Sequence, residues 1–269
     1  MYSGLLVRYG ELYLKTNFVR RQFERILMDN IRRELKELKI KARTKLLFGR
    51  IVIETDDIRK ASAALEHTFG VISFSPAITC EKNYPDIKKN SIRIAKTFRK
   101  GTFAVDARRS DKSFRPNSQQ LKEKIGREIC KMGHRVDLSK PDNRLCIEIR
   151  DGCYIYSKST AGPGGMPLGT GGRVAGFLLS KEGLAAAWLM MKRGVEVVAI
   201  GKCDKKLYSI LEKWSTGRKL KTAKNITEAR KNGAIAVIGK KKKSAMVVFN
   251  PLVGYDKDDF EKLYEFISR

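Results

Sequence analysis

Basic side chains gather in one short segment, residues 108–122, and their most direct use would be to bind phosphate. Arginine offers a planar fork of N–H donors that matches phosphate oxygens, and lysine offers a compact positive charge. The candidate contacts are Arg108, Arg109, Lys112 and Arg115. An ordinary solvated loop without a ligand is the alternative interpretation of the same residues.

Two elements must hold these side chains in place. Residues 103–107 alternate in polarity, which predicts a strand, and residues 119–132 place Leu121, Ile125 and Ile129 on one face, which predicts a helix. Residues 116–118 predict a turn and a helix start, because Asn and Ser side chains can accept from the first amides of a helix. A strand, a basic loop and a helix N-terminus therefore converge, and this geometry suits phosphate.

The charge of the whole chain supports a polyanionic partner. The sequence has 56 Lys and Arg against 29 Asp and Glu, a net charge of +27 over 269 residues. Residues 81–150, which include the basic loop, carry 19 basic and 9 acidic side chains. Nucleic acid is the commonest polyanion, so we expect RNA or DNA binding. An amphipathic helix is predicted over residues 18–38, and its outer face is basic. This face is either an ordinary solvated helix surface or an extension of the anion-binding surface, with Lys15, Arg20 and Arg21 as candidate contacts.

Cysteine and histidine usage argues against a metal site. The five cysteines form no C-x-x-C pair and only two histidines are present, so no metal ligand is assigned. Most of these cysteines are expected to be buried thiols, which indicates a reducing compartment and a cytoplasmic protein. No apolar run is long enough to cross a bilayer and no signal peptide is recognisable, so no membrane association is expected.

Periodicity divides the chain into three α/β or α+β parts joined by a linker. Residues 1–54 predict a strand, a helix and a hairpin around Gly49, and residues 55–158 alternate helices and strands, with one strand interrupted by Pro76. Residues 159–172 contain eight Gly or Pro, so neither helix nor strand is expected there. Residues 173–269 alternate apolar strands and helices, which predicts a reduced Rossmann-like domain with a parallel sheet.

Several segments resemble the ThiI-type tRNA 4-thiouridine synthetases. Residues 5–35 resemble their N-terminal ferredoxin-like domain, and residues 103–126 with VDLSKPD at 136–142 resemble a THUMP domain. GPGGMPLGTGGRV at 162–174 resembles the segment leading into their ATP-pyrophosphatase domain, and residues 184–200 and 250–260 resemble later parts of it. The resemblance implies binding to the acceptor end of tRNA, mostly through shape and backbone. The RNA contacts that it implies are Arg108, Arg109, Lys112, Arg115, Asn117 and Lys122. The resemblance does not decide whether the chain forms a homodimer.

The third domain departs from the family pattern. The family loop S-G-G-x-D-S is replaced by SKEGLA at 180–185, where Lys181 and Glu182 stand in place of glycines that wrap pyrophosphate. Downstream, the family segment T-G-D-S-L-G-Q is reduced to Ile238-Gly239 and four lysines, and no cysteine follows Cys203, where the family has its catalytic one. The remaining, vestigial nucleotide-binding positions are Leu178, Leu179, Ser180 and Gly239.

These departures predict a tRNA-binding protein that has lost adenylation and sulfur transfer, with no catalytic residue and no cofactor. The alternative is a divergent tRNA sulfurtransferase that still uses ATP and Mg²⁺, with Cys203 as a sulfur carrier. In that alternative the neighbouring Lys202, Lys205 and Lys206 would lower the pKa of the Cys203 thiol. The interpretation we favour for Cys203 is an ordinary surface cysteine without a catalytic role.

Overall fold

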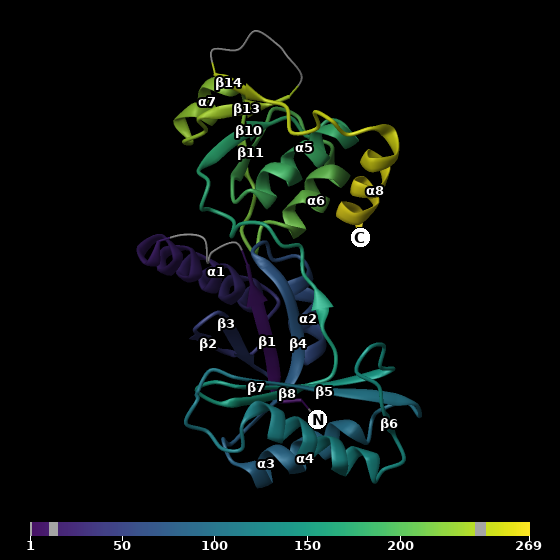
Figure 1. The fold of residues 1–269 in the computed structure, drawn as a ribbon. Helices are drawn as coiled ribbons and strands as arrows, with labels where there is room; N and C mark the ends of the chain where they lie inside the picture. The colour runs from purple at the N-terminus through teal and green to yellow at the C-terminus, as the bar shows by residue number, and fades with distance from the viewer. Residues whose placement is uncertain (1, 11–15, 240–245) are drawn as a thin grey trace. The chain divides into compact units, whose positions relative to one another are not determined.

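The computed structural model describes residues 2–10, 16–239 and 246–269, and these form two compact units (Figure 1). The first unit comprises Met1–Arg8, Lys41–Ala61 and Ser73–Thr160. The second unit comprises Tyr9–Ile40, Ser62–Ile72 and Ala161–Arg269. The first unit thus draws its residues from three separate stretches of the chain.

A long mixed sheet forms the first unit, in the order β2-β3-β1-β4-β8-β7-β5-β6, with β9 also paired to β4. Neighbouring strands are antiparallel from β2 to β1 and from β4 to β7, whereas β5 is parallel to both β7 and β6. The strands are β1 (Gly4–Tyr9), β2 (Arg43–Leu47), β3 (Arg50–Glu54), β4 (Val71–Cys80), β5 (Thr102–Arg109), β6 (Arg135–Val136), β7 (Asn143–Ile149), β8 (Cys153–Tyr156) and β9 (Thr160–Ala161).

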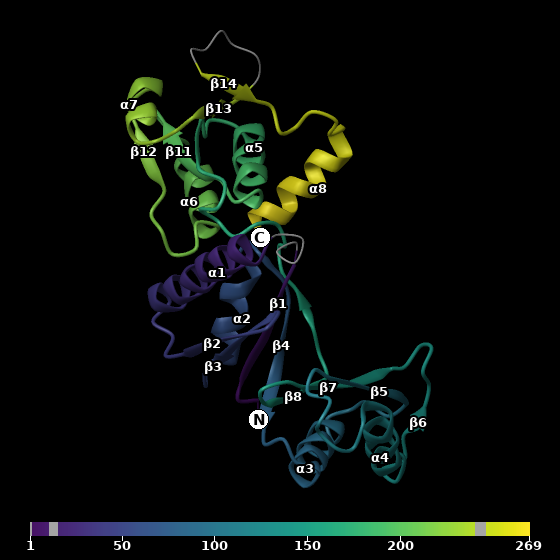
Figure 2. The same cartoon turned by 60° about the vertical axis from the view of Figure 1, so that its left-hand side comes forward.

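Helices α3 (Tyr84–Ala95) and α4 (Ser118–Cys130) cover one face of this sheet (Figure 2). Leu121, Ile125 and Ile129 are fully buried against apolar strand residues such as Phe103 and Leu145, so the predicted helix face is confirmed. Because this core lies directly under β5 and α4, it fixes the two elements that flank the basic loop. A smaller apolar cluster, which includes Leu6, Val52 and Tyr156, draws on β1, β3 and β8.

The second unit contains a five-stranded parallel sheet in the order β12-β11-β10-β13-β14. Its strands are β10 (Arg173–Gly176), β11 (Glu196–Ile200), β12 (Lys221–Ala223), β13 (Ala236–Ile238) and β14 (Val247–Phe249). Strand order reverses between β10 and β13, as in doubly wound folds, and ligands of such folds bind at this point beyond the strand ends. The predicted Rossmann-like arrangement is confirmed.

Helices cover both faces of this parallel sheet. Helices α5 (Lys181–Lys192), α6 (Lys205–Lys213) and α8 (Lys257–Ser268) contribute to one large core, in which Trp188 and Trp214 are buried edge to face with ring centroids 5.2 Å apart. Helix α7 (Ile226–Lys231) contributes to a smaller core that includes Ala175 and Val198.

Helix α1 (Asn17–Glu37) belongs to the second unit, and α2 (Ile58–Glu66) spans the division between the units. The buried amide of Asn30 on α1 donates to the carbonyl of Leu168 (2.9 Å) and accepts from Arg218 (3.0 Å). These bonds satisfy a polar group in an apolar setting, so they fix α1 against the segment that leads into β10.

Two expectations about the backbone were wrong. The Gly/Pro-rich segment at 159–172 does contain a short strand, β9, because Thr160 and Ala161 find a partner in β4. Strand β4 also runs through Pro76 without a break, although proline lacks the N–H that the ladder could use there. The short elements β6, β12 and α7 were not predicted, since segments of two to six residues carry little periodic signal.

Candidate nucleic-acid interface

The predicted basic loop lies between β5 and α4 and is closed by its own hydrogen bonds. The Arg109 guanidinium donates to the carbonyls of Lys112 (3.0 Å) and Phe114. Asp111 accepts from the Ser113 amide (3.0 Å) and hydroxyl and pairs with Lys82 (3.1 Å). The bonds from Ser113, followed by Lys82, lower the pKa of Asp111 to about 2. The loop therefore has a defined shape.

Some of the predicted contact residues are exposed, and the others make hydrogen bonds within the protein. Arg108, Lys112 and Arg115 are exposed, whereas Arg109 is half-buried and is committed to loop carbonyls. Asn117 is the N-cap of α4: its side chain accepts from the Gln120 amide (2.9 Å), and its own amide donates to the Gln120 side chain (3.0 Å). The helix start at Asn117 is therefore as predicted, and its side-chain oxygen is occupied by it.

Lys122 lines a groove formed by β5, β6 and α4. Its ammonium is 4.0 Å from Asp106, which also pairs with Arg144 at 2.5 Å. The groove has a volume of about 730 Å³ and is lined by apolar residues of β5 and β6 together with basic residues of α4. Lys122 therefore shares a surface with Arg144, which the sequence did not single out.

The second predicted basic surface lies on α1, in the second unit. Arg21 is exposed, and Arg20 is half-buried with its Nε 3.8 Å from the carboxylate of Glu24. Glu24 is buried and also accepts from the Tyr9 hydroxyl (2.7 Å). Lys15 lies outside the described residues, as do the lysines at 240–243. This geometry does not test any of the predicted RNA contacts, so all of them stay predictions.

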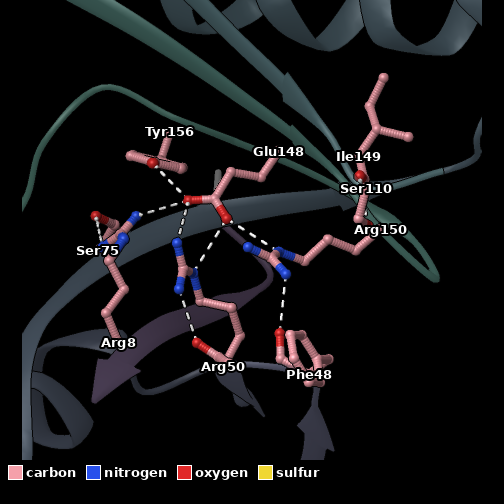
Figure 3. Close-up of polar contacts among 10 residues, drawn as sticks. Arg8, Phe48, Arg50, Ser75, Ser110, Glu148, Ile149, Arg150 and Tyr156 are labelled. Carbon is pink, nitrogen blue, oxygen red and sulfur yellow. Dashed lines mark hydrogen bonds and ion pairs between the residues drawn. The ribbon is translucent and has the colours of Figure 1, made fainter. Parts of the chain in front are cut away.

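A cluster that sequence reasoning missed lies on the strands of the first unit (Figure 3). The buried carboxylate of Glu148 on β7 accepts hydrogen bonds from the guanidiniums of Arg50 on β3 (3.1 Å) and Arg150 just after β7 (3.1 Å). Arg8 on β1 lies 3.5 Å from the same carboxylate, and the Tyr156 hydroxyl on β8 donates to it at 2.9 Å. We call Arg8, Arg50, Glu148, Arg150 and Tyr156 the Glu148 cluster.

The positive neighbours set the ionisation of this cluster. Burial by itself would raise the pKa of Glu148, but the charge of Arg50 and the hydrogen bond from Tyr156 outweigh it, so the pKa lies below its ordinary value of 4.5. Burial and the nearby Glu148 charge raise the pKa of Tyr156, which stays a neutral donor. The cluster therefore holds one carboxylate and three guanidiniums at neutral pH.

The sequence carried only a weak signal for these residues. Glu148 stands in a predicted strand between Ile147 and Ile149, and a charged residue there could equally have faced solvent. Its partners come from β1, β3 and β8, as far as 140 residues away in the chain, so local spacing could not bring them together.

The vestigial nucleotide positions meet at the point where strand order reverses in the second unit. Ser180 caps α5, since its hydroxyl accepts from the Gly183 amide (3.2 Å). Leu179, Ser180 and Gly239 line a hollow of about 370 Å³, whereas Leu178 is buried in the core. The Lys181 ammonium lies 4.6 Å from the Tyr264 ring centroid, and Glu182 adds a carboxylate to the lining. The carboxylate of Glu182 in this lining disfavours a triphosphate, whose oxygens are also negative.

Cys203 lacks the lowered pKa that the sulfurtransferase alternative requires. Partial burial raises the pKa of its thiol, although lysines follow and precede it in sequence. The thiol lies 3.8 Å from the carbonyl of Gly201, and a raised pKa disfavours the thiolate that a sulfur carrier needs. Within the described ranges, no group of three or more His, Cys, Asp or Glu residues could hold a metal ion. No helix in those ranges combines the length and apolar character needed to cross a membrane.

Comparison with known proteins identifies the two N-terminal modules. Residues 4–75 match the ThiI ferredoxin-like domain and residues 81–158 match the THUMP domain. A protein of Moorella thermoacetica named "Probable tRNA sulfurtransferase" is 40% identical over 207 residues, which cover 74% of this chain and 52% of that protein. The chain thus spans about half the length of the curated relatives it matches.

Two solved structures share the fold. A crystal structure of a protein from Pyrococcus horikoshii Ot3 has a TM-score of 0.86 and 31% identity, and covers 98% of both chains. A 4-thiouridine synthetase in complex with RNA and ATP has a TM-score of 0.81 at 24% identity, covering all of this chain and 86% of that one. With a ferredoxin-like domain, a THUMP domain and a Rossmann-like sheet in this order, the chain belongs to the ThiI-type THUMP proteins.

Proposed function

We propose that this chain binds tRNA through its THUMP-containing unit and does not itself adenylate the tRNA or transfer sulfur to it. The observation that carries the proposal is the ordered basic loop, which presents Arg108, Lys112 and Arg115 at the surface above a rigid strand and a capped helix. Positive side chains at fixed positions suit the regular phosphate spacing of a folded RNA. The names of the relatives, which are tRNA sulfurtransferases, supply the class of RNA.

The acceptor end is the part of tRNA that we assign to this surface. The support is the family relationship of the THUMP domain together with the charge of the unit that contains it. Five free thiols fit a reducing, cytoplasmic setting. Whether the chain forms a homodimer is tested by measuring the mass of the purified protein with and without tRNA.

The test of tRNA binding is a filter-binding titration over a range of salt concentrations. A triple variant R108Q/K112Q/R115Q removes three exposed charges, and K89Q/R93Q/K96Q removes three exposed charges on or next to α3 as the matched control. If each residue of the loop neutralises one phosphate, the slope of log K against log salt falls by about 2 to 3 for the loop variant. Equal slopes for the two variants would remove the basic loop from the interface.

The proposed absence of adenylation rests on the lining of the hollow beside α5. Glu182 adds a carboxylate to this lining, which would repel phosphate oxygens, and Lys181 packs on Tyr264. ATP–pyrophosphate exchange in the presence of tRNA tests this point. We expect exchange no faster than in a reaction without protein.

A divergent ATP-dependent tRNA sulfurtransferase is the second candidate. One observation favours it: Ser180 still caps α5 at the strand reversal, next to a hollow of about 370 Å³. Exchange that is clearly above background, and that is lost in S180A, would establish this candidate and reject the first.

A further inference from the structure

Strand β5 has an open edge. It pairs with β7 over residues 103–109, whereas on its other side β6 pairs only with Thr102 and Phe103. Among the described residues, the sheet ends at β6, which Figure 2 shows beside β5 (Figure 2). Residues 104–109 therefore have a neighbouring strand on one side alone. The backbone N–H and C=O groups of such an edge can pair with a strand from another chain.

An apolar groove follows this open edge. Four consecutive residues of β5, 103–106, line the groove of about 730 Å³ that β5, β6 and α4 form. Successive side chains of a strand point to opposite faces, so a groove lined by all four residues runs along the strand edge. Its apolar lining continues with Val136 and Leu138, which are 55% and 75% exposed.

The loop that carries Leu138 has a defined shape. The Asp137 carboxylate accepts from the two amides that follow Leu138, at 2.8 and 3.0 Å. At the end of the loop, the Asp142 carboxylate accepts from the amide (2.7 Å) and the hydroxyl (2.8 Å) of Thr102. The loop thus keeps Leu138 in water, next to the exposed Val136 and above an apolar groove. A contiguous apolar patch of this kind marks a contact with another molecule.

The charge of the groove selects the chemistry of its occupant. Basic side chains outnumber acidic ones in the lining, which contains Lys122, Arg127, Lys131 and Arg144 against Asp106 and Glu123. Asp106 is already paired with Arg144 and Lys122, so its charge is compensated within the protein. The remaining positive charge favours an acidic occupant.

Two other occupants fit less well. A second copy of this chain carries a net charge of +27, so it would be repelled by a basic groove. Unpaired RNA bases need exposed aromatic rings on which to stack. The aromatic residue of the lining is Phe103, which is only 1% exposed. An acidic protein segment with apolar side chains matches both the charge and the apolar lining.

We propose that the open edge of β5 binds an extended acidic segment of a partner protein, which adds to the sheet as a further strand. Main-chain hydrogen bonds to residues 104–109 hold the segment in register. Its apolar side chains contact Val136 and Leu138, and its acidic side chains lie next to Lys122 and Arg127. The interaction goes beyond the proposed function, because the partner is a protein and binding does not require tRNA.

Fluorescence anisotropy with short labelled peptides tests the proposal. The probe is a peptide in which Glu and Leu alternate, as they would on the two faces of a strand. One control peptide has Lys in place of Glu, and another has the same composition with Leu at helical spacing. We expect the alternating acidic peptide to bind at least about tenfold more tightly than either control.

Variants of the groove are compared with matched variants elsewhere in the first unit. L138S removes the exposed leucine of the groove, and L46S removes an exposed leucine (41%) of β2, at the other end of the sheet. R127Q and R93Q each remove an exposed arginine, from α4 and from α3. We expect L138S to weaken peptide binding by about tenfold or more. R127Q should weaken it by up to about fivefold, and the two controls should leave it unchanged.

The thiol of Cys130 reports where the peptide binds. Cys130 is exposed and lines the groove, whereas Cys203 belongs to the second unit. Alkylation by iodoacetamide is followed for each cysteine by mass spectrometry. Bound acidic peptide should slow the alkylation of Cys130 and leave that of Cys203 unchanged.

Four outcomes would overturn the proposal. The first is no binding of the alternating acidic peptide at concentrations up to about 1 mM. The second is tighter binding of the helically spaced peptide, which would exclude addition as a strand. The third is equal affinity of L138S and L46S. The fourth is protection of Cys130 by a short single-stranded RNA but not by the peptide, which would assign the groove to RNA. Binding of tRNA by the wild-type chain together with the first outcome would leave the proposed function intact.

Discussion

Replacing Glu148 by glutamine should destabilise the first unit far more than the same change at an exposed carboxylate. The Glu148 side chain is 4% exposed and neutralises part of the charge of three guanidiniums. E148Q keeps the size of the side chain and removes its charge, so Arg8, Arg50 and Arg150 then repel one another without a counter-ion. Removing one partner of a buried ion pair typically costs about 3–5 kcal/mol.

Asp106 provides the matched control within the same sheet. It pairs with Arg144 and Lys122, but its side chain is 39% exposed, so water screens the interaction. D106N should therefore cost about 0–1 kcal/mol. The two variants make the same chemical change, and the comparison isolates the effect of burial.

Hydrogen exchange of the β7 and β8 amides measures this difference in the right part of the chain. Both tryptophans, Trp188 and Trp214, lie in the second unit, so tryptophan fluorescence would not report on this sheet. Every 1.36 kcal/mol of lost stability lowers the protection factor about tenfold. Protection should therefore fall by about 150-fold to 5000-fold in E148Q and by no more than about fivefold in D106N. Similar small losses in both variants would show that Glu148 does not hold the arginines together.

The pH dependence has a definite sign. The pKa of Glu148 in the folded chain lies below its ordinary value of 4.5, so the carboxylate stabilises the fold above about pH 4.5. This contribution is lost as the pH falls through the lower, folded pKa. The difference in protection between the wild-type chain and E148Q should therefore shrink below pH 4.5. A difference that stays constant down to the acid transition would contradict the assignment.

Three further predictions concern local geometry. N117A should lower the melting temperature at a cost of about 1 kcal/mol, because the Asn117 side-chain oxygen that accepts from the Gln120 amide caps α4. G183A should lower the amount of folded second unit seen by tryptophan fluorescence, because a Cβ there would lie 2.3 Å from the Phe177 carbonyl oxygen. G126A is the control, because a Cβ there would have no atom within 4 Å. It should stabilise α4 by up to about 1 kcal/mol. An NMR titration of the Asp111 carboxyl should give a pKa of about 2, and the bonds that close the basic loop should persist above the ordinary value of 3.8 and be lost as the pH falls towards 2.

Local sequence signals were sufficient for the segment that carries the predicted RNA contacts. The strand at 103–107, the cap at Asn117 and the face formed by Leu121, Ile125 and Ile129 all depend on neighbours within a few residues, and all are present. The same reasoning could not tell that Arg109 is committed to the carbonyls of Lys112 and Phe114, because that depends on the path of the loop. Exposure of each basic side chain is a property of the folded backbone.

The sequence alone could not predict contacts between side chains on strands that lie far apart in the chain. The alternation of residues 143–149 predicts a strand but does not say that Glu148 faces a partly buried interior, nor that Arg8 and Arg50 reach the same carboxylate. The lowered pKa that the sulfurtransferase alternative assumed for Cys203 is absent for a related reason. Neighbours in sequence suggested a lowered pKa, while partial burial, which only the fold reveals, raises it.

The Glu148 cluster also joins the two matched modules. Arg8 and Arg50 come from the part of the chain that matches the ferredoxin-like domain, and Glu148, Arg150 and Tyr156 come from the THUMP part. The ion pairs of Glu148 therefore run from one module to the other within one continuous sheet. Separating the modules should remove the cluster even when each module folds, since neither part alone brings three guanidiniums to one carboxylate.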